Sequence, residues 1–231
     1  MYALILAGGK GERLRPYTED RPKPMVPVNG TPIVEHQIRW LKRQGVDHFV
    51  LLCGYLHHVI EEYFGDGSRW DVSIEYSLEE SPLGRGGAFK QGFARVPRGE
   101  AFVIGTNGDN LNTQDLRPVF EAHRASGALV TALLTQLRSP YGIATIDESN
   151  RITGFMEKPL LPYWLNAGVY VISAACFDRF PDLGDHEDST FPTLAQEGKL
   201  HAFRSTSYWR AIDTVKDLTD AAQEFVAFES R

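Results

Sequence analysis

The sequence contains very few sulfur-bearing residues. Its 231 residues include two cysteines and three methionines. Cys53 and Cys176 both lie in apolar stretches, which favours two small core side chains over a disulfide or a reactive pair. No cysteine–histidine spacing indicates zinc, and no cysteine framework of the kind found in small secreted domains is present. We therefore expect neither a structural metal site nor secretion.

Basic charge and long apolar runs are also scarce. The chain has 24 lysines and arginines against 30 aspartates and glutamates, which gives a net charge of −6. Binding to a nucleic-acid duplex needs a basic face that displaces counterions, so nucleic acid is not the expected partner. No apolar run approaches the length of a membrane span, and no leader peptide with a cleavage site opens the chain. We expect a cytoplasmic protein that binds small molecules and has no membrane partner.

Short apolar runs that end at glycines dominate the first half of the chain. Such continuous runs are typical of strands buried on both faces of a parallel sheet. They occur at 3–7, 49–53 and 101–104, with further strands expected at 72–76 and 129–134. Amphipathic segments between them predict helices at 31–45, with Thr31 as N-cap, and at 59–64, 89–94 and 119–124. This alternation predicts an α/β fold with a mostly parallel, doubly wound sheet.

The second half of the chain is less regular. Strands are expected near Ile143, Val169 and His201, and loops separate them. We interpret this half as a continuation of the sheet plus a small subdomain. The length fits one domain over residues 1–231, and no repeat or low-complexity linker divides it.

A glycine-rich turn follows the first expected strand. Residues Gly8–Gly11 contain three glycines, and backbone N–H groups in such a turn form a nest for phosphate oxygens. Leu14 stands where the third glycine of a dinucleotide fingerprint belongs, and no Gly-Lys-Ser/Thr ends a P-loop. A plain strand–turn–helix connection remains an alternative, but Arg13 and Arg15 close by favour phosphate binding.

A second notable segment, Arg21–Pro27, carries Lys23 among three prolines. Proline fixes φ, so a lysine on this segment has little conformational entropy to lose when it meets an anion. On its own, the segment also fits an extended surface connection with solvated charges.

Taken together, Gly-Gly-Lys-Gly-Glu-Arg-Leu-Arg-Pro and Arg-Pro-Lys-Pro-Met resemble the signature of sugar nucleotidylyltransferases, also called NDP-sugar pyrophosphorylases, with Glu12 in place of the customary threonine. Further motifs follow in that family's order: a base-binding loop, a metal-binding turn, two sugar-phosphate segments and a terminal acidic motif. They lie at Ser81–Gly87, Asn107–Asp109, Glu157–Pro159, Asn166–Gly168 and Trp209–Asp217. The resemblance thus covers nearly the whole chain.

The resemblance implies a Rossmann-like (GT-A-like) fold and an Mg²⁺-dependent transfer between a nucleoside triphosphate and a sugar 1-phosphate. An oxygen of the sugar phosphate would attack the α-phosphorus, and pyrophosphate would leave in line. Residues 1–135 would form the nucleotide-binding half and residues 136–231 the half that binds the sugar phosphate. The implied assembly is a monomer or homodimer, without the acyltransferase domain of bifunctional relatives.

The same resemblance assigns roles to individual residues. Arg13 and Lys23 would be catalytic, and Asp109 would bind the metal. The nucleotide would contact Leu6, Ala7, Gly8, Gly9, Lys10, Gly11, Glu79, Pro82, Gly84, Asn107 and Gly108. The sugar phosphate would contact Gly142, Glu157, Lys158 and Asn166.

The second metal ligand needs separate treatment. Many relatives read W-x-D-I-G-T, whereas this chain has Ala211 at the usual aspartate position and Asp213 at the usual glycine. Glucose-1-phosphate cytidylyltransferases carry W-x-x-M-D-T, with the aspartate in the later place. We therefore expect Asp213 to be the second ligand. The alternative is that Asp213 caps the last helix, a task that Thr214 could share.

The motifs leave the nucleobase open. Glu79 or Glu80 lies in the region that reads the base in relatives. The loop Pro82–Gly87 is most similar to those of guanylyltransferases and some uridylyltransferases, while other segments resemble enzymes for CTP or dTTP. Among these bases we favour GTP. A catalytically silent nucleotide-binding homologue is the alternative of another class. A glycosyltransferase would need a D-x-D motif, and Asn107-Gly108-Asp109 offers only its second aspartate.

Overall fold

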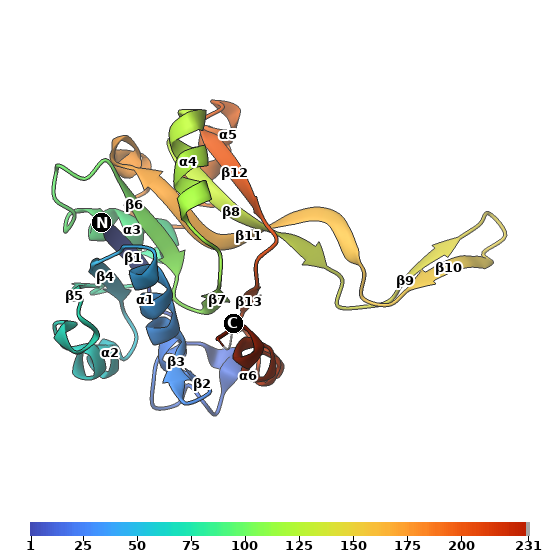
Figure 1. Ribbon diagram of the computed structural model, residues 1–231, viewed down its shortest axis with the longest axis horizontal. Helices are drawn as coiled ribbons and strands as arrows, with labels where there is room; N and C mark the ends of the chain where they lie inside the picture. Colours follow the sequence, from blue (N-terminus) through green and yellow to red (C-terminus); the bar gives the residue numbers. More distant parts are fainter. Residues whose placement is uncertain (230–231) are drawn as a thin grey trace.

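A seven-stranded sheet runs through the centre of the protein (Figure 1). The computed structural model describes the backbone of residues 1–229 and the side chains of residues 1–225. In spatial order the strands are β12 (Leu200–Ser205), β8 (Val130–Arg138), β11 (Leu160–Ser173), β6 (Phe102–Asn107), β1 (Tyr2–Leu6), β4 (His48–Cys53) and β5 (Ser73–Leu78). Neighbouring strands of this sheet are parallel except where β11 pairs with β6 and β8. The predicted mostly parallel sheet is confirmed.

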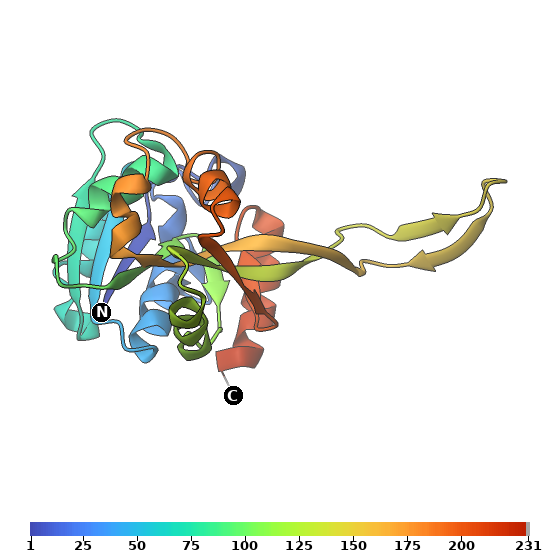
Figure 2. The same cartoon turned by 90° about the horizontal axis from the view of Figure 1, so that it is seen from above.

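Helices cover both faces of the sheet (Figure 2). One face carries α1 (Ile33–Arg43), α2 (His57–Phe64) and α4 (Arg117–Ser126), and the other carries α3 (Gly84–Phe93) and α5 (Thr190–Gln196). Side chains of β1 alternate between the two cores: Ile5 packs with Ile38 of α1, and Leu4 packs with Phe89 of α3. The sheet is therefore buried on both faces, as its continuous apolar strands predict.

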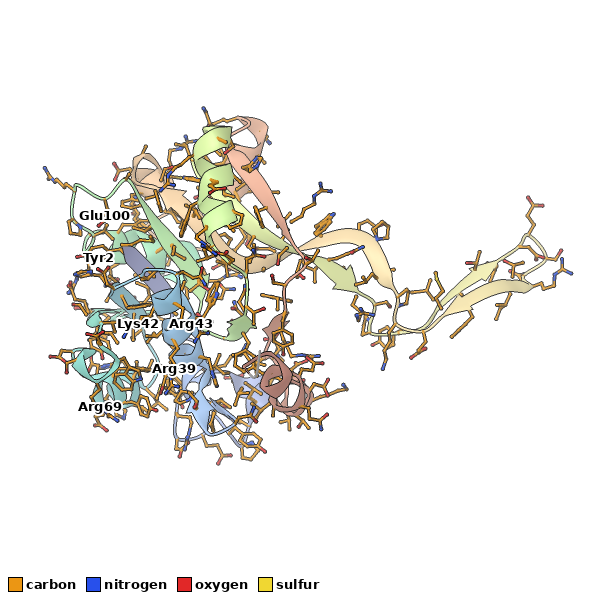
Figure 3. All side chains as sticks on the ribbon, viewed as in Figure 1. Tyr2, Arg39, Lys42, Arg43, Arg69 and Glu100 are labelled. Carbon is orange, nitrogen blue, oxygen red and sulfur yellow. The ribbon has the colours of Figure 1, made fainter. Side chains whose placement is uncertain are left out.

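The outer surface of α1 is basic. Arg39, Lys42 and Arg43 lie on the exposed side of the helix (Figure 3), opposite the buried Val34 and Leu41. This separation is the amphipathic pattern by which the helix was predicted. None of the described helices is long and apolar enough to cross a membrane.

The predicted start of the first helix is wrong. Thr31 and Pro32 form the short strand β3 (Thr31–Pro32), which pairs with β2 (Pro27–Val28) in an antiparallel hairpin. Helix α1 begins at Ile33, and Pro32 in the N-cap position makes no side-chain hydrogen bond. The hairpin occupies the residue that local capping preference would have used.

Helix α3 starts earlier than predicted, at Gly84 instead of Phe89. Glycine disfavours helix, so the run Gly84-Arg85-Gly86-Gly87 carries no local signal for it. The N–H groups of Gly86 and Gly87 donate to the Gly184 carbonyl at 2.9 and 3.2 Å. A Cβ on Gly86 would stand 2.6 Å from Pro181 Cγ, so close packing against this loop explains the glycine there.

A third core ties the last helix to the start of the chain. Helix α6 (Val215–Glu229) places Leu218 and Phe225 against Leu14 and Val26. Just before it, β13 (Trp209–Ala211) pairs with β7 (Asn110–Asn112) in an antiparallel ladder. These contacts bring the end of the chain to the edge of the sheet where β1 and β6 end.

A long two-stranded ribbon projects from the sheet (Figures 1 and 2). It contains β9 (Ile143–Ile146) and β10 (Ile152–Met156), which pair only with each other within the described residues. We call residues 139–159 the arm. The expected strands near Val169 and His201 join the central sheet, whereas the strand at Ile143 belongs to the arm.

Candidate active site

The carboxyl ends of β1 and β6 lie beside each other, with Leu6 paired to Asn107. The Gly108 N–H donates to the Leu6 carbonyl at 2.8 Å. A Cβ on Gly108 would stand 2.3 Å from the same carbonyl oxygen, so only glycine allows this approach. The turn therefore places Asp109 next to the glycine-rich loop after β1.

That loop also positions Lys23. The Lys23 N–H donates to the Gly9 carbonyl at 3.2 Å, and Gly11 adopts a φ of +67°. A Cβ on Gly11 would be 2.7 Å from Lys23 Cβ, so the glycine makes room for the lysine stem. The Lys23 side chain is only 9% exposed, and its ammonium reaches the edge of the sheet.

Asp213, which lies near the other end of the sequence, is positioned at the same edge of the sheet. The ladder between β13 and β7 pairs Ala211 with Asn110. The Ile212 N–H then donates to the Asp109 carbonyl at 2.9 Å. Two backbone contacts thus align the chain after Trp209 with the turn that carries Asp109.

The four charged groups meet around the Lys23 ammonium. Lys23 Nζ lies 2.6 Å from Asp109 Oδ2 and 2.7 Å from Asp213 Oδ1, and Arg13 Nη2 lies 3.0 Å from Asp213 Oδ1. We call Arg13, Lys23, Asp109 and Asp213 the charged cluster. All four were singled out from the sequence, and the fold brings them together.

The charges within the cluster stabilise one another. Burial lowers the pKa of Lys23, but Asp109 and Asp213 outweigh burial and raise that pKa above its usual value. Burial also raises the pKa of Asp213, yet the hydrogen bond from Lys23 and the charges of Lys23 and Arg13 leave it below its usual value. The ammonium and the Asp213 carboxylate are therefore both held in their charged forms.

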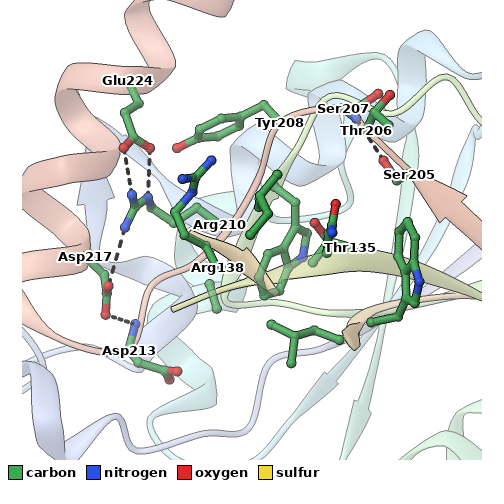
Figure 4. Close-up of a pocket in the computed structure, with 16 residues that line it drawn as sticks. Thr135, Arg138, Ser205, Thr206, Ser207, Tyr208, Arg210, Asp213, Asp217 and Glu224 are labelled. Atoms are coloured by element: carbon green, nitrogen blue, oxygen red, sulfur yellow. Dashed lines mark hydrogen bonds and ion pairs between the residues drawn. The ribbon is translucent and has the colours of Figure 1, made fainter. Parts of the chain in front are cut away.

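The cap of α6 is made by other residues. Thr214 Oγ1 accepts a hydrogen bond from the Asp217 N–H at 3.2 Å, and Asp217 Oδ2 accepts from the Thr214 N–H at 2.9 Å. This reciprocal pair satisfies N–H groups of the first turn in the manner of a capping box. Figure 4 shows Asp217 at the backbone of Asp213 while the Asp213 carboxylate points elsewhere. The geometry therefore disfavours Asp213 as the helix cap.

The cluster also bears on metal binding. Among the described side chains, those of residues 1–225, no group of three or more His, Cys, Asp or Glu is arranged to hold a metal ion. Asp109 and Asp213 nevertheless direct carboxylate oxygens at one point, and the cation that they share there is the Lys23 ammonium. Two carboxylates fit a hard divalent cation that takes its other ligands from phosphate and water.

Three cavities meet near this cluster. The glycine-loop cavity measures about 350 Å³ and lies between the loop after β1, the start of α3 and the turn after β6. The carboxylate cavity, of about 670 Å³, contains all four residues of the charged cluster. The outer cavity, of about 840 Å³, lies between the root of the arm, β13 and α6 (Figure 4) and reaches the cluster at Asp213.

Most residues expected to bind nucleotide line the glycine-loop cavity. They are Leu6, Gly8, Gly9, Glu79, Pro82, Gly84, Asn107 and Gly108. Gly11 lines the carboxylate cavity instead, Ala7 is fully buried, and Lys10 is exposed, with its ammonium 6.0 Å from the centre of the Tyr55 ring.

The residues expected to bind sugar phosphate are divided. Asn166 lines the carboxylate cavity, where its side-chain amide donates to the Tyr170 hydroxyl at 2.7 Å. Gly142, Glu157 and Lys158 lie on the arm and line none of the three cavities. The structure brings Gly142 and Glu157 close to each other, because a Cβ on Gly142 would stand 2.9 Å from Glu157 Oε2.

One carboxylate inside the glycine-loop cavity has an altered proton affinity. Burial raises the pKa of Glu79 above its usual value, although the Leu83 N–H, at 3.1 Å from Glu79 Oε2, opposes the rise. Glu80 beside it is exposed and does not line the cavity. Glu79 is therefore the better placed of the two candidate base-reading residues.

Sequence reasoning missed several cavity residues. Arg85 lines both the glycine-loop and carboxylate cavities, and it is held by Asp185 at 2.6 Å and by Glu187 at 3.0 Å. Asp185 lies 100 residues farther along the chain, and no motif marks it. Arg85, in contrast, stands inside the base-loop motif Ser81–Gly87, so its place in that motif was a usable signal.

The sequence is related to those of known nucleotidyltransferases. A model of the nucleotidyl transferase family matches residues 2–227. The chain is 36% identical over 232 residues to mannose-1-phosphate guanylyltransferase of Mycobacterium tuberculosis, over 97% of this chain and 64% of that protein. It is 34% identical over 229 residues to D-glycero-alpha-D-manno-heptose 1-phosphate guanylyltransferase of Aneurinibacillus thermoaerophilus, over 97% of this chain and 98% of that one.

The fold has solved counterparts as well. HddC from Yersinia pseudotuberculosis superposes with a TM-score of 0.77 at 26% identity, covering 97% of this chain and 99% of that one. The match of the family model over nearly all of the sequence agrees with the order of its motifs and with this fold. The chain therefore belongs to the nucleotidyl transferase family and is a nucleotidyltransferase of the sugar-1-phosphate nucleotidylyltransferase type.

Proposed function

We propose that this chain is a guanylyltransferase that converts GTP and a sugar 1-phosphate into a GDP-sugar and pyrophosphate. The observation that carries the proposal is the charged cluster, which lies where the glycine-loop cavity and the carboxylate cavity meet. The choice of GTP is supported by the Aneurinibacillus relative, a guanylyltransferase that this chain matches over nearly its whole length.

The reaction needs charge neutralisation more than covalent help from the protein. An oxygen of the sugar phosphate attacks the α-phosphorus of GTP, the bond from that phosphorus to the bridging oxygen breaks, and pyrophosphate leaves with this oxygen. Lys23 would offset the charge that develops at the α-phosphate. Arg13, which is more exposed, would hold the β- and γ-phosphates. Both residues would thus act as preorganised charges.

Mg²⁺ is the proposed cofactor, held by Asp109 and Asp213. When bound, it would supply positive charge to the triphosphate. Mg²⁺ commonly uses one or two protein carboxylates and completes its shell with phosphate and water, which suits a site of two aspartates. The ammonium of Lys23 would then turn from the carboxylates toward the substrate.

The remaining predicted residues would divide between the two substrates. Backbone N–H groups of Gly8–Gly11 would hold phosphates, with Lys10 at the outer side, and the region of Glu79 and Gly84 would read guanine. Asn166 would contact the sugar phosphate, joined by Gly142, Glu157 and Lys158 of the arm. Residues 1–135 and 136–231 thus correspond to the proposed nucleotide and sugar-phosphate halves.

The proposed location of the protein is the cytoplasm. The buried free thiols of Cys53 and Cys176 suit this reducing compartment.

The test is an assay of pyrophosphate release. The purified protein is incubated with Mg²⁺, each nucleoside triphosphate in turn, and mannose, heptose or glucose 1-phosphate. We expect the highest kcat/KM with GTP. Pyrophosphate from CTP, dTTP or UTP alone would overturn the choice of base, and no pyrophosphate from any pair would favour a catalytically silent homologue.

Glu79→Gln is expected to weaken GTP binding selectively. Guanine presents two neighbouring N–H donors, and one carboxylate can accept both. Replacing the charged acceptor should raise the KM for GTP about 10-fold or more, in line with a loss of roughly 1.5–3 kcal/mol, with little change in kcat. Glu80→Gln is the matched control, since Glu80 is the exposed neighbour. An effect confined to Glu80→Gln would reassign the base-reading role.

The Glu79 carboxylate should also make the KM for GTP depend on pH on the acidic side. Because burial raises the pKa of Glu79, the side chain takes up a proton at higher pH than an ordinary glutamate. The KM for GTP in the wild type should therefore rise as the pH falls toward that pKa, and this rise should be absent in Glu79→Gln. KM–pH profiles that run parallel in the two proteins would contradict the assignment.

Asp213→Asn and Thr214→Ala should separate the site from the helix cap. Asp213→Asn should lower kcat about 10²-fold, the scale seen for a preorganised charged group. It should add little to a second change at Asp109, since both residues act on one ion. Thr214→Ala should instead reduce the free energy of unfolding by about 1 kcal/mol with near-normal kcat. The reverse pattern in the two variants would identify Asp213 as the cap.

A further inference from the structure

A glutamine lies among the apolar side chains by which α1 packs on the sheet. Gln37 is 1% exposed, and it stands between Val34 and Leu41, which are fully buried on the same face of the helix. A buried polar group costs free energy unless it is hydrogen-bonded. Helix α1 also lies against β7, the short strand that follows the turn with Asp109 (Figure 1). The hydrogen bonds of Gln37 therefore concern that turn.

The side-chain amide of Gln37 donates to both ends of the turn. Its Nε2 lies 2.6 Å from the Asn107 carbonyl oxygen, 2.7 Å from the Asn110 carbonyl oxygen and 3.3 Å from Asn110 Oδ1. Three oxygens around one nitrogen determine the orientation of the amide, because the reversed amide would place its own oxygen against them. One side chain thus holds the residue before Gly108 and the residue after Asp109.

The oxygen of the same amide contributes no such bond. Gln37 Oε1 is buried and has no hydrogen-bond partner among the described residues. An unpartnered buried acceptor destabilises the folded state, and an apolar side chain of similar shape would avoid that cost. Local departures from a well-packed apolar core are expected where a residue serves a functional site. The two N–H groups are therefore what this position supplies to the fold.

Two other parts of the fold hold the backbone of the same turn. The Gly108 N–H donates to the Leu6 carbonyl of β1, and the Asp109 carbonyl accepts from the N–H of Ile212, just after β13. Helix α1 adds a third side through its glutamine. These contacts use backbone groups of the turn. They fix where the Asp109 carboxylate points and leave its oxygens for the charged cluster.

We propose that Gln37 is a positioning residue for catalysis, which holds both ends of the turn and keeps the Asp109 carboxylate directed at the point that it shares with Asp213. Gln37 lines none of the three cavities near the cluster, so it acts through Asp109. Partners that orient a metal ligand typically contribute roughly 10- to 100-fold to metal affinity or activity. The inference rests on the proposed function for the role of Asp109.

Gln37→Met removes the two donors and keeps a side chain of similar shape. At saturating Mg²⁺ we expect kcat to fall about 10-fold or more, and the Mg²⁺ concentration for half-maximal rate to rise about 10-fold. The KM values for GTP and the sugar 1-phosphate should change less than about 3-fold, because the cavity walls are untouched. Gln37→Glu is the second variant. Its buried carboxyl takes up a proton among the three oxygens and keeps one O–H donor, so its kcat should lie between those of the wild type and Gln37→Met.

Trp40→Phe is the matched control on the same helix. Trp40 is buried, and its Nε1 donates to the Gln114 carbonyl at 2.9 Å. Gln114 lines none of the three cavities. The control thus loses a buried hydrogen bond between α1 and the backbone, as Gln37→Met does, but away from the cluster. It should lower the melting temperature and leave kcat and the Mg²⁺ dependence as in the wild type.

A further measurement needs neither activity nor metal. The amides of Gly108 and Ile212 are bonded within the turn and to it, so they exchange with deuterium when the turn opens. In the metal-free protein, Gln37→Met should speed the exchange of both amides about 10-fold or more, since two hydrogen bonds are lost. Trp40→Phe should leave both exchange rates unchanged.

The contrary results are distinct from one another. Unchanged kcat, Mg²⁺ dependence or amide exchange in Gln37→Met overturns the positioning role, and so do equal losses of kcat in Gln37→Met and Trp40→Phe. Near-normal pyrophosphate release by Asp109→Asn overturns the proposed metal site and this inference with it. An inactive Asp109→Asn beside a fully active Gln37→Met overturns the positioning role alone. If the wild type releases no pyrophosphate with any substrate pair, the proposed function fails, and amide exchange still decides whether Gln37 holds the turn.

Discussion

Asp109→Asn is expected to reduce pyrophosphate release to below about a thousandth of the wild-type rate. The side chain is replaced by one of equal size, so the backbone contacts of its turn to Leu6 and Ile212 should persist. What is lost is one of the two negative charges that face Lys23. An asparagine oxygen is a weaker ligand for Mg²⁺ than a carboxylate oxygen. In a site with only two protein carboxylates, no third one can compensate for the loss of Asp109.

Two measurements separate loss of metal from loss of fold. Binding of Mn²⁺, followed by electron paramagnetic resonance in the presence of GTP, should weaken in Asp109→Asn, while the melting temperature should stay near that of the wild type. Asp71→Asn is the matched control, because Asp71 is paired with Lys42 at 3.1 Å on the surface of the protein. Near-normal pyrophosphate release by Asp109→Asn would remove Asp109 from the catalytic site.

The central sheet was predictable because its signals are local. Apolar runs that stop at glycine, such as the one before Gly8, identify strands buried on both faces wherever they pair. The same pattern places the glycine-rich turn Gly8–Gly11 at the end of β1, and the register of β1 with β6 brings Asn107, at the end of β6, beside it. Parallel strands of a doubly wound sheet share one edge for their carboxyl ends, so the place of the site followed from the fold class.

The chemistry of the site depended on contacts that the sequence does not encode locally. Lys23 and Asp213 are 190 residues apart, and only the resemblance to a family connected them. Asp185 escaped notice for the same reason, since its role is to hold Arg85 from across the cavity. A pairing of this kind depends on how α3 packs against the loop before α5, and no spacing in the chain reports that packing.

The errors also have physical causes. Thr31 is a good helix cap by type, but the hairpin of β2 and β3 engages it first. The start of α3 is a run of glycines, which only tertiary contacts to Gly184 make helical. The motif around Glu157 marked a segment of expected function, while its location on a projecting arm follows from the ladder between Arg138 and Leu160. In each of these cases a backbone contact elsewhere in the fold, either in the adjacent hairpin or far along the chain, overrides the local preference of the residue.

Lys23→Ala is expected to act on catalysis and on metal binding in opposite directions. The Lys23 side chain is 9% exposed, and its ammonium lies within 2.7 Å of both Asp109 and Asp213, whereas Arg13 is paired with Asp213 alone. Loss of the ammonium should lower kcat by about 10²- to 10³-fold, as expected when a preorganised charge is removed from the transition state. A rise in KM alone would mean that Lys23 binds substrate and transition state equally.

Metal binding without nucleotide should become tighter in the same variant. In the wild type the ammonium occupies the point at which both carboxylates are directed, so a divalent cation must displace it. Alanine removes this competitor and leaves two carboxylates that repel each other, which should lower the melting temperature without metal and allow Mn²⁺ to restore it. Lys42→Ala, which removes a lysine paired with Asp71 on the surface, should change none of these quantities. If Lys23→Ala weakened Mn²⁺ binding in the absence of GTP, the lysine would be supporting the metal site, and the proposed competition between ammonium and metal would be wrong.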